Sequence, residues 1–190
     1  MKIVFDVDNV LADSMTCWCK KASHYLESTI TKNDIRSHKI VGSVRMEARK
    51  IFELQDQVWK EWESLPPTES NLNRKLNALR ENGFKIYIAT SRPKRLTDCV
   101  LQWLDKRKIS YDSFFPLGPR QLKTNIDADA LVDDAPEQIR EFVRAGRVGF
   151  IYDQPWNIKV KIGKTIRVKK IDDVLVHYKL LDVNTSLPEF

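Results

Sequence analysis

Two aspartates, Asp6 and Asp8, follow an apolar, strand-like run near the N-terminus, in the stretch IVFDVDNVL of residues 3–11. Side chains alternate across a strand, so residues two apart point the same way and the two carboxylates are expected to meet at one strand end. Like charges at that distance repel unless a cation or a shared proton relieves them. The pair suits a magnesium site in which one carboxylate attacks phosphorus, although an isolated pair of this kind also occurs at solvated turns.

Polar groups also follow further apolar, strand-like runs. Two of these runs are KIYIATSRP at residues 85–93 and ADALVDDAPEQI at residues 128–139, and a third, VGFIYDQPWN at residues 148–157, ends in a polar, aromatic turn. The polar side chains of interest are, in chain order, Thr90, Ser91, Arg92, Lys123, Asp133 and Asp134. Because ligands of open α/β sheets bind at the carboxyl ends of the strands, these side chains are expected to share one site with the N-terminal pair.

The order DxD, Thr/Ser, Lys, Asp-Asp resembles that of the haloacid dehalogenase superfamily of phosphohydrolases. Within it, DxDxVLAD, ATS, DQPWN and a lysine ten residues before the Asp pair resemble the 5'(3')-deoxyribonucleotidase family. The resemblance covers residues 1–16 and 70–180. It implies a Mg²⁺-dependent phosphomonoesterase that hydrolyses nucleoside monophosphates through an aspartyl-phosphate, and it implies a homodimer, for which no residue pattern shows an interface.

Asp6 is then the expected nucleophile, because a carboxylate can take a phosphoryl group and release it to water in a second step. Asp8 is the expected general acid and base. Its carboxyl group must carry a proton at the right moment, which crowding by other acids favours. The resemblance implies that the backbone carbonyl of Asp8 also binds Mg²⁺.

Asp133 and Asp134 would anchor Mg²⁺ with Asp6, and the sequence does not say which of the two binds directly. Thr90 would donate its hydroxyl to a phosphate oxygen, with Ser91 and Arg92 as further phosphate contacts. The last expected role belongs to Lys123, which would neutralise phosphate charge, with Arg120 as an alternative cation. Helix N-terminal capping and solvated lysines are the structural alternatives for these positions.

Two positions depart from the family pattern. Asn9 replaces the commoner glycine, and asparagine tolerates a left-handed backbone. Related nucleotidases place an aromatic residue soon after the catalytic loop, and this chain has Ser14 at the closest position. Four tryptophans are candidates for base stacking, but aromatic residues at helical spacing more often belong to a core; they are Trp18, Trp59, Trp62 and Trp156. The three histidines show no ligand spacing and receive no role.

Bulk composition limits the class of protein. The 190 residues are 42% apolar, which suits one domain, or one domain with a small insert. No stretch is long and apolar enough to predict a membrane span. The three cysteines lack a disulfide spacing and, with no leader segment in the sequence, favour reduced thiols and a cytoplasmic location. A net charge of +6 suits a phosphorylated partner, and the spread of the basic residues favours a solvated face over a nucleic-acid groove.

The alternation of strands and helices predicts an α/β fold, a Rossmann-like parallel sheet with helices on both faces. Strands are expected at residues 2–7, 85–90, 111–116, 129–132, 148–152 and 165–168. Helices are expected at residues 15–26 (with Ser14 as N-cap), 34–38, 44–62, from 68–70 to 83, 95–108, 136–145 and from 172. The excess of helix before the second strand predicts a small helical cap, residues 14–66, inserted into a core of residues 1–13 and 67–190.

Two alternatives remain open from the sequence. A phosphatase that acts on nucleic-acid ends, or on another small phosphorylated metabolite, would share the same catalytic set. A non-catalytic regulatory protein of the same fold is disfavoured, because every expected catalytic position is filled.

Overall fold

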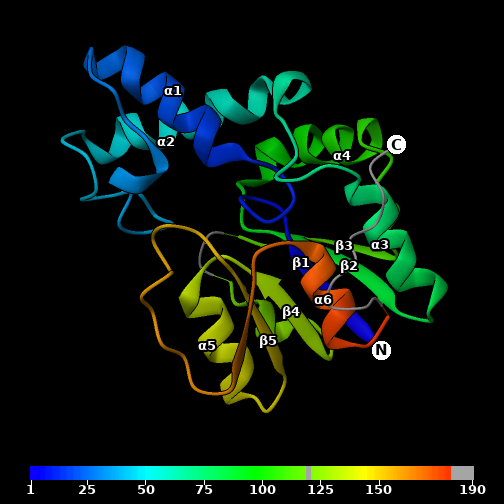
Figure 1. The fold of residues 1–190 in the computed structure, drawn as a ribbon. Coiled ribbons are helices and arrows are strands. Elements are labelled where there is room, and N and C mark those ends of the chain that lie inside the picture. The colour runs from blue at the N-terminus through cyan, green and yellow to red at the C-terminus, as the bar shows by residue number, and fades with distance from the viewer. Residues whose placement is uncertain (119–120, 181–190) are drawn as a thin grey trace.

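A six-stranded parallel sheet forms the centre of the protein (Figure 1). The computed structural model describes residues 1–118 and 121–180. The strands are β1 (Lys2–Asp6), β2 (Lys85–Thr90), β3 (Ser113–Pro116), β4 (Ala130–Asp133), β5 (Val148–Tyr152) and β6 (Thr165–Val168). Their spatial order, β3-β2-β1-β4-β5-β6, is that of a Rossmann-type sheet, so the predicted fold class is confirmed.

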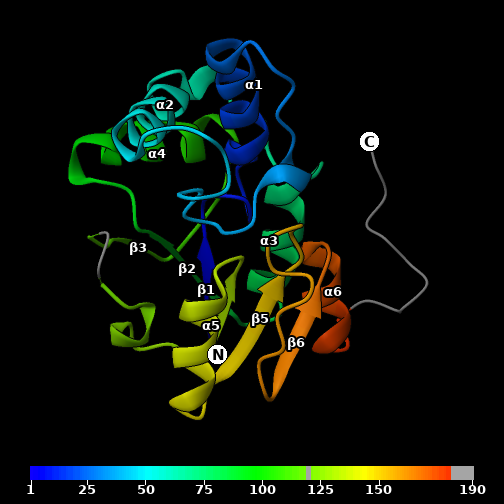
Figure 2. The same cartoon turned by 90° about the vertical axis from the view of Figure 1, so that its left-hand side faces the viewer.

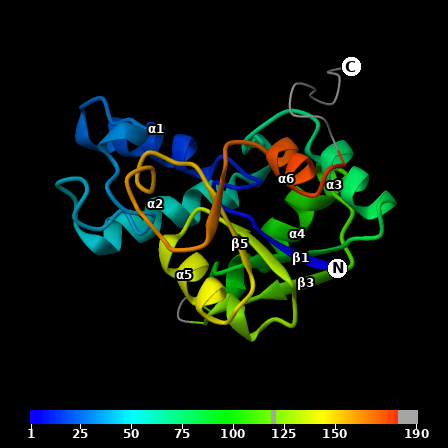
Figure 3. The same cartoon turned by 60° about the horizontal axis from the view of Figure 1, so that its bottom comes forward.

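Helices cover both faces of the sheet, because the central strands β1 and β4 carry apolar side chains on both sides. The helices are α1 (Ser14–Leu26), α2 (Ala48–Lys60), α3 (Leu72–Glu81), α4 (Thr97–Lys106), α5 (Pro136–Arg144) and α6 (Ile171–His177). Val4 of β1 belongs to the same apolar cluster as Ile139 and Phe142 of α5. Ile3 and Phe5 belong to the larger cluster that includes the buried residues of α3, α4 and α6, and Figure 3 shows α5 on the other side of the sheet from α3 and α6.

Several predicted helix boundaries were wrong. The helix expected at residues 44–62 begins at Ala48, because Val44 and Met46 pack their side chains on the core from an irregular loop. The helix expected at 34–38 is replaced by a 3₁₀ turn at Lys32–Asp34. Apolar spacing alone does not distinguish a helix from a loop that packs its side chains inward.

The N-cap of α1 is Asp13 and not Ser14. The Asp13 carboxylate accepts a hydrogen bond from the Thr16 backbone N–H at 3.4 Å. Ser14 is the first helical residue, and its hydroxyl is turned toward the loop that follows β1. The N-cap therefore lies one residue before the predicted position.

The helical insert, defined here as residues 14–66, lies over the carboxyl ends of the strands (Figure 2). Its buried residues Trp18, Ile51 and Trp59 belong to the same apolar cluster as Phe5 of the sheet. The rings of Trp59 in α2 and Trp103 in α4 meet edge to face, with centroids 6.4 Å apart. The insert is therefore packed against the sheet layer. None of the described helices has the length and hydropathy that crossing a bilayer requires.

Close packing of α5 on β5 depends on Gly149. A methyl group at this position would lie 2.7 Å from Val143 Cγ2 and 3.0 Å from Ile139 Cγ2. We expect Gly149→Ala to lower the free energy of unfolding by about 1–3 kcal/mol, measured by denaturant titration, because the helix must move off the sheet. Gly163→Ala is the matched control, since nothing lies within 4 Å of its added methyl group, and equal stability of the two variants would contradict this account.

Candidate active site

Three carboxylates converge at the ends of two neighbouring strands. Asp6 is the last residue of β1 and Asp133 the last of β4, and these strands pair directly through Phe5 and Val132. One carboxylate oxygen from each of Asp6, Asp133 and Asp134 lies within 4.8 Å of the others. All three residues are buried. The predicted convergence of distant acids is therefore present in this structure.

The ammonium group of Lys123 joins two of these acids. Its Nζ donates to Asp6 Oδ1 and to Asp133 Oδ2, each at 2.5 Å. Lys123 lies in the 3₁₀ turn Lys123–Asn125 and is 2% exposed, so the pairing takes place away from solvent. Three carboxylates face one ammonium, which leaves two negative charges that a divalent cation could balance. Arg120, the alternative cation, lies outside the described residues.

Burial and crowding change the proton affinities of this cluster. Burial raises the pKa of Asp6 to about 7, with Lys123 opposing and Asp133 adding to the shift. Burial also raises the pKa of Asp134, and the neighbouring Asp133 carboxylate adds to it. Burial alone would lower the pKa of Lys123, but the charges of Asp133 and Asp6 outweigh burial and raise it. The lysine therefore stays charged while the acids compete for protons or a metal ion.

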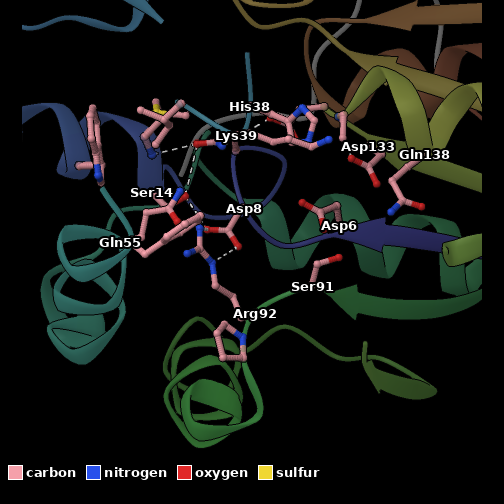
Figure 4. Close-up of a pocket in the computed structure, with 18 of the residues that line it drawn as sticks. Asp6, Asp8, Ser14, His38, Lys39, Gln55, Ser91, Arg92, Asp133 and Gln138 are labelled. Atoms are coloured by element: carbon pink, nitrogen blue, oxygen red, sulfur yellow. Dashed lines mark hydrogen bonds and ion pairs between the residues drawn. The ribbon is translucent and has the colours of Figure 1, made fainter. Parts of the chain in front are cut away.

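Asp8 is held separately from these acids. Arg92 donates to it in a two-pronged ion pair, Nε to Oδ2 and Nη2 to Oδ1, both at 2.8 Å (Figure 4). Ser14 Oγ donates to Oδ1 at 2.6 Å and Trp59 Nε1 donates to the same oxygen at 2.9 Å. Asp8 is absent from the acidic group of Asp6, Asp133 and Asp134, so its carboxylate is not placed as a metal ligand there.

The expected proton affinity of Asp8 was wrong. Asp6 and Asp8 line the same cavity, although the strand rule used to bring them together stops at Asp6, where β1 ends, and the chain turns at Asn9, which has a φ of 59°. Burial would raise the pKa of Asp8, as expected from crowding, but the charge of Arg92 and the donors Ser14 and Trp59 lower it overall. In this structure Asp8 is stabilised as a carboxylate. The predicted left-handed backbone at Asn9 is present.

The hydroxyl-bearing end of β2 lies beside β1. Asp6 pairs in register with Ala89, so Thr90 follows at the same edge of the sheet. Thr90 is fully buried, and its hydroxyl accepts a hydrogen bond from the Arg92 backbone N–H at 3.2 Å. Ser91 and Arg92, by contrast, line the cavity described next.

A cavity of about 750 Å³ lies between the helical insert and the strand ends. Its floor includes the acids and Lys123, and its other walls come from both parts of the chain (Figure 4). Phe52 and Val41 of the insert and Leu122 of the core are exposed apolar side chains that line it. The arrangement gives the cavity a charged floor and a partly apolar mouth, which suits a ligand with one anionic end and one apolar part.

Several contacts around the site were missed by sequence reasoning. Asn9 Nδ2 and Trp156 Nε1 both donate to Asp134 Oδ2, at 3.4 and 3.1 Å. His38, which received no role, lines the cavity and lies 3.5 Å from Glu137 at the start of α5. A lone histidine in an irregular loop carries no spacing signal, so only the fold brings it there.

The tryptophans behave mainly as core residues, as helical spacing favoured. Trp18 and Trp59 are buried in the insert, Trp62 is half-buried, and only Trp18 of these three lines the cavity. Trp156 is buried beside Asp134. Phe52, on α2, is an exposed aromatic residue that lines the cavity. The sequence pattern did not predict this exposure, because Phe52 has the same helical spacing as the buried residues of α2.

Comparison with known proteins places this geometry in a family. The family model of the 5' nucleotidase, deoxy (pyrimidine), cytosolic type C proteins matches residues 1–181. The chain belongs to this family. A nucleotidase of Clostridium acetobutylicum is 23% identical over 177 residues, which are 92% of this chain and 91% of that relative.

Solved structures share the fold of this nucleotidase-family chain. A haloacid dehalogenase-like hydrolase from Streptococcus pneumoniae has a TM-score of 0.67 at 14% identity, covering 93% of this chain and 97% of that one. A hydrolase of the same superfamily from Deinococcus radiodurans, solved with bound phosphate and sodium, has a TM-score of 0.66 at 11% identity, covering 95% and 97%. With the family match, these confirm the predicted haloacid dehalogenase superfamily membership and an enzyme of the nucleotidase and phosphatase type.

Removing the buried cation should expose the repulsion among the acids. We expect Lys123→Met to lower the free energy of unfolding by about 3–5 kcal/mol, because two buried carboxylates lose their partner. Without Lys123 the pKa of Asp6 rises above its value of about 7. A carboxyl group whose pKa is raised on folding contributes most stability at low pH, and that contribution falls as the pH rises through the folded value.

The loss should therefore be larger at pH 8 than at pH 6, as measured by denaturant unfolding without added metal. Lys161→Met, at an exposed position, is the control and should match the native protein at both values. A Lys123→Met variant with native stability at pH 8 would show that the ion pairs contribute little.

Proposed function

We propose that this protein is a Mg²⁺-dependent phosphomonoesterase that hydrolyses nucleoside monophosphates through an aspartyl-phosphate at Asp6. The observation that carries the proposal is the buried group of three carboxylates around Lys123, at the floor of a cavity. Family membership supports a nucleotide as substrate.

Asp6 is the proposed nucleophile because Lys123 fixes one of its carboxylate oxygens and the residue lines the cavity. A bond forms from an Asp6 oxygen to phosphorus while the ester P–O bond breaks, and the leaving oxygen takes a proton from Asp8. A water molecule then attacks the phosphorus, Asp8 accepts its proton, and inorganic phosphate leaves with Asp6 restored. The charge on Lys123 compensates the negative charge that gathers on phosphate oxygens.

Asp8 requires a proton before the first step, although Arg92 favours its charged form. A substrate phosphate that enters beside Arg92 would offer the guanidinium a second anion and so weaken its pair with Asp8. Arg92 and Ser91 line the cavity and are the proposed phosphate contacts. Thr90 accepts from the Arg92 backbone N–H, which leaves its own hydroxyl hydrogen free to donate to a phosphate that reaches this buried position.

The acidic group fits a magnesium ion. Mg²⁺ prefers hard oxygen ligands and keeps several waters, so a few carboxylates suffice, and two uncompensated negative charges match its charge. Asp6 and Asp134 are the proposed carboxylate ligands. Both oxygens of Asp133 already accept hydrogen bonds, from Lys123 and from the Ala135 backbone N–H, whereas the pair of Asp6 with Lys123 uses only its Oδ1. The Asp8 carbonyl remains the predicted backbone ligand. Bound Mg²⁺ would supply further charge compensation for the phosphate.

The helical insert is the proposed cap over a core of residues 1–13 and 67–190. It lines one side of the cavity, so it would limit the size of substrate and exclude bulk water. A cavity closed on this side favours a small nucleotide over a nucleic-acid end, although the net charge of +6 favours the latter. The three free cysteines are consistent with a cytoplasmic location, and the homodimer remains a prediction.

Asp6→Asn should abolish phosphate release, with a loss of at least about 10³-fold, because the carboxamide cannot take the phosphoryl group. The assay is release of inorganic phosphate from nucleoside monophosphates with Mg²⁺ or with a chelator. Asp127→Asn, at an almost fully exposed side chain, is the matched control and should keep native activity. Equal rates for Asp6→Asn and the native protein, or full activity in chelator, would refute the proposal. Absence of turnover by the native protein with every substrate, even with Mg²⁺, would favour a non-catalytic protein.

Mg²⁺ binding should weaken as the pH falls below 7. Burial raises the pKa of Asp6 to about 7 and also raises the pKa of Asp134, so protons compete with the metal for these carboxylates and any proton held there must leave when the metal binds. Calorimetric titration with Mg²⁺ at pH 6 and pH 8 should show tighter binding at pH 8, and Asp134→Asn should weaken binding at least about tenfold. Unchanged affinity in Asp134→Asn would remove that residue from the metal site.

Salt dependence separates the two substrate classes. A nucleic-acid substrate makes several phosphate contacts, so its binding falls steeply with salt, whereas a nucleoside monophosphate contributes a single phosphate group. We expect KM for nucleoside monophosphates to change only a few-fold between about 50 and 200 mM salt. Over the same range, binding that depends on many phosphate contacts loses about 10³-fold or more in affinity. Faster turnover of 5'-phosphorylated oligonucleotides than of mononucleotides would favour the alternative.

A further inference from the structure

The indole N–H of Trp59 donates to a carboxylate, although Trp59 is a buried core residue. Trp59 is fully buried in α2 of the helical insert, yet its Nε1 donates to Asp8 Oδ1, 51 residues away in the chain. The other fully buried tryptophans, Trp18 and Trp103, donate to backbone carbonyls, those of Ile51 and Leu65. Ordinary core packing satisfies an indole N–H in that way, whereas Trp59 contacts the proposed acid and base.

The two oxygens of Asp8 are held from different parts of the protein. Oδ1 accepts from Ser14 and Trp59, which both belong to the helical insert, and from Arg92 Nη2. Oδ2 has one described donor, Arg92 Nε. Three donors saturate Oδ1, so Oδ2 is the oxygen with room for a further hydrogen bond.

The Trp59 ring cannot follow Asp8 by rotating freely. It is packed edge to face against Trp103 of α4, at 6.4 Å between centroids, and both rings are fully buried. The surrounding side chains fix the direction of the Trp59 N–H. The position of α2 therefore determines where this N–H contacts the Asp8 carboxylate. Displacement of the insert would remove two of the three donors on Oδ1.

We propose that Trp59 is a positioning residue that, with Ser14, fixes Asp8 Oδ1 and so presents Oδ2 to the leaving oxygen of the substrate. The inference rests on the proposed role of Asp8 as acid and base, and it adds that the helical insert sets the orientation of this carboxylate. In the first step a proton moves from Oδ2 to the leaving oxygen as the P–O ester bond breaks. A misplaced Asp8 slows that step most when the leaving group is a strongly basic alkoxide, and least when it is a nitrophenolate, which departs without a proton.

The test compares two leaving groups in Trp59→Phe, which removes the N–H but keeps an aromatic ring. The readout is kcat/KM, which reports the steps up to phosphoryl transfer, for a nucleoside 5'-monophosphate and for para-nitrophenyl phosphate. We expect a fall of about tenfold for the nucleotide, a part of the 10²–10⁴ that acid–base catalysis supplies, and less than about twofold for the nitrophenyl ester. The ratio of the two values should therefore change about fivefold or more.

Trp62→Phe is the control, because it makes the same substitution in the helical insert at a half-buried ring that neither lines the cavity nor donates to Asp8. It should leave the ratio of the two kcat/KM values at the native level. An unchanged ratio in Trp59→Phe, or an equal shift in both variants, would overturn the inference and leave Trp59 a core residue. If Trp59→Phe does not fold, Ser14→Ala removes the other insert donor and should shift the ratio in the same direction; an unchanged ratio there would count against the inference.

Failure of the proposed function is recognised separately. It would appear in the native protein, as absence of Mg²⁺-dependent turnover of both substrates or as full activity of Asp6→Asn. The present inference fails only in the variants, when native turnover is intact and the ratio of the two substrates does not respond.

Discussion

A single buried ammonium group, that of Lys123, allows acidic side chains from separate parts of the chain to share one corner of the sheet. It donates to Asp6 and Asp133, each at 2.5 Å, and Asp134 lies beside them. Without it, adjacent carboxylates in a buried site would have to be protonated. With it, two negative charges remain for a divalent cation, and one carboxylate stays oriented toward the cavity. The proposed chemistry depends on this balance of charge.

The sheet order supplies the position at which that balance is possible. β1 lies between β2 and β4, so the residues that end these three strands are neighbours although they are far apart in sequence. The helical insert closes the opposite side of the cavity and contacts Asp8 through Ser14 and Trp59. Two carboxylates two residues apart therefore have different environments. Asp6 lies with acids and a lysine, whereas Asp8 lies among donors.

The sequence was sufficient to predict the fold class and the residues at the strand ends, because apolar runs followed by polar groups carry a strong local signal. It could not predict the environment of Asp8, because Arg92, Ser14 and Trp59 reach it from three elements. Trp59 is a core residue and has the helical spacing of one, so the sequence pattern cannot show that its N–H contacts Asp8. Likewise, His38 reaches the cavity from an irregular loop whose path depends on tertiary packing.

The central claim, that the Asp6 carboxylate takes the phosphoryl group, can be tested by trapping the intermediate. The protein is mixed with Mg²⁺ and substrate, stopped within milliseconds and treated with borohydride, which reduces an acyl phosphate to an alcohol. Peptide mass analysis should then find homoserine in place of aspartate at position 6, and not at position 8, 133 or 134. Modification at one of those other positions, or none at any aspartate under conditions of full turnover, would contradict the account.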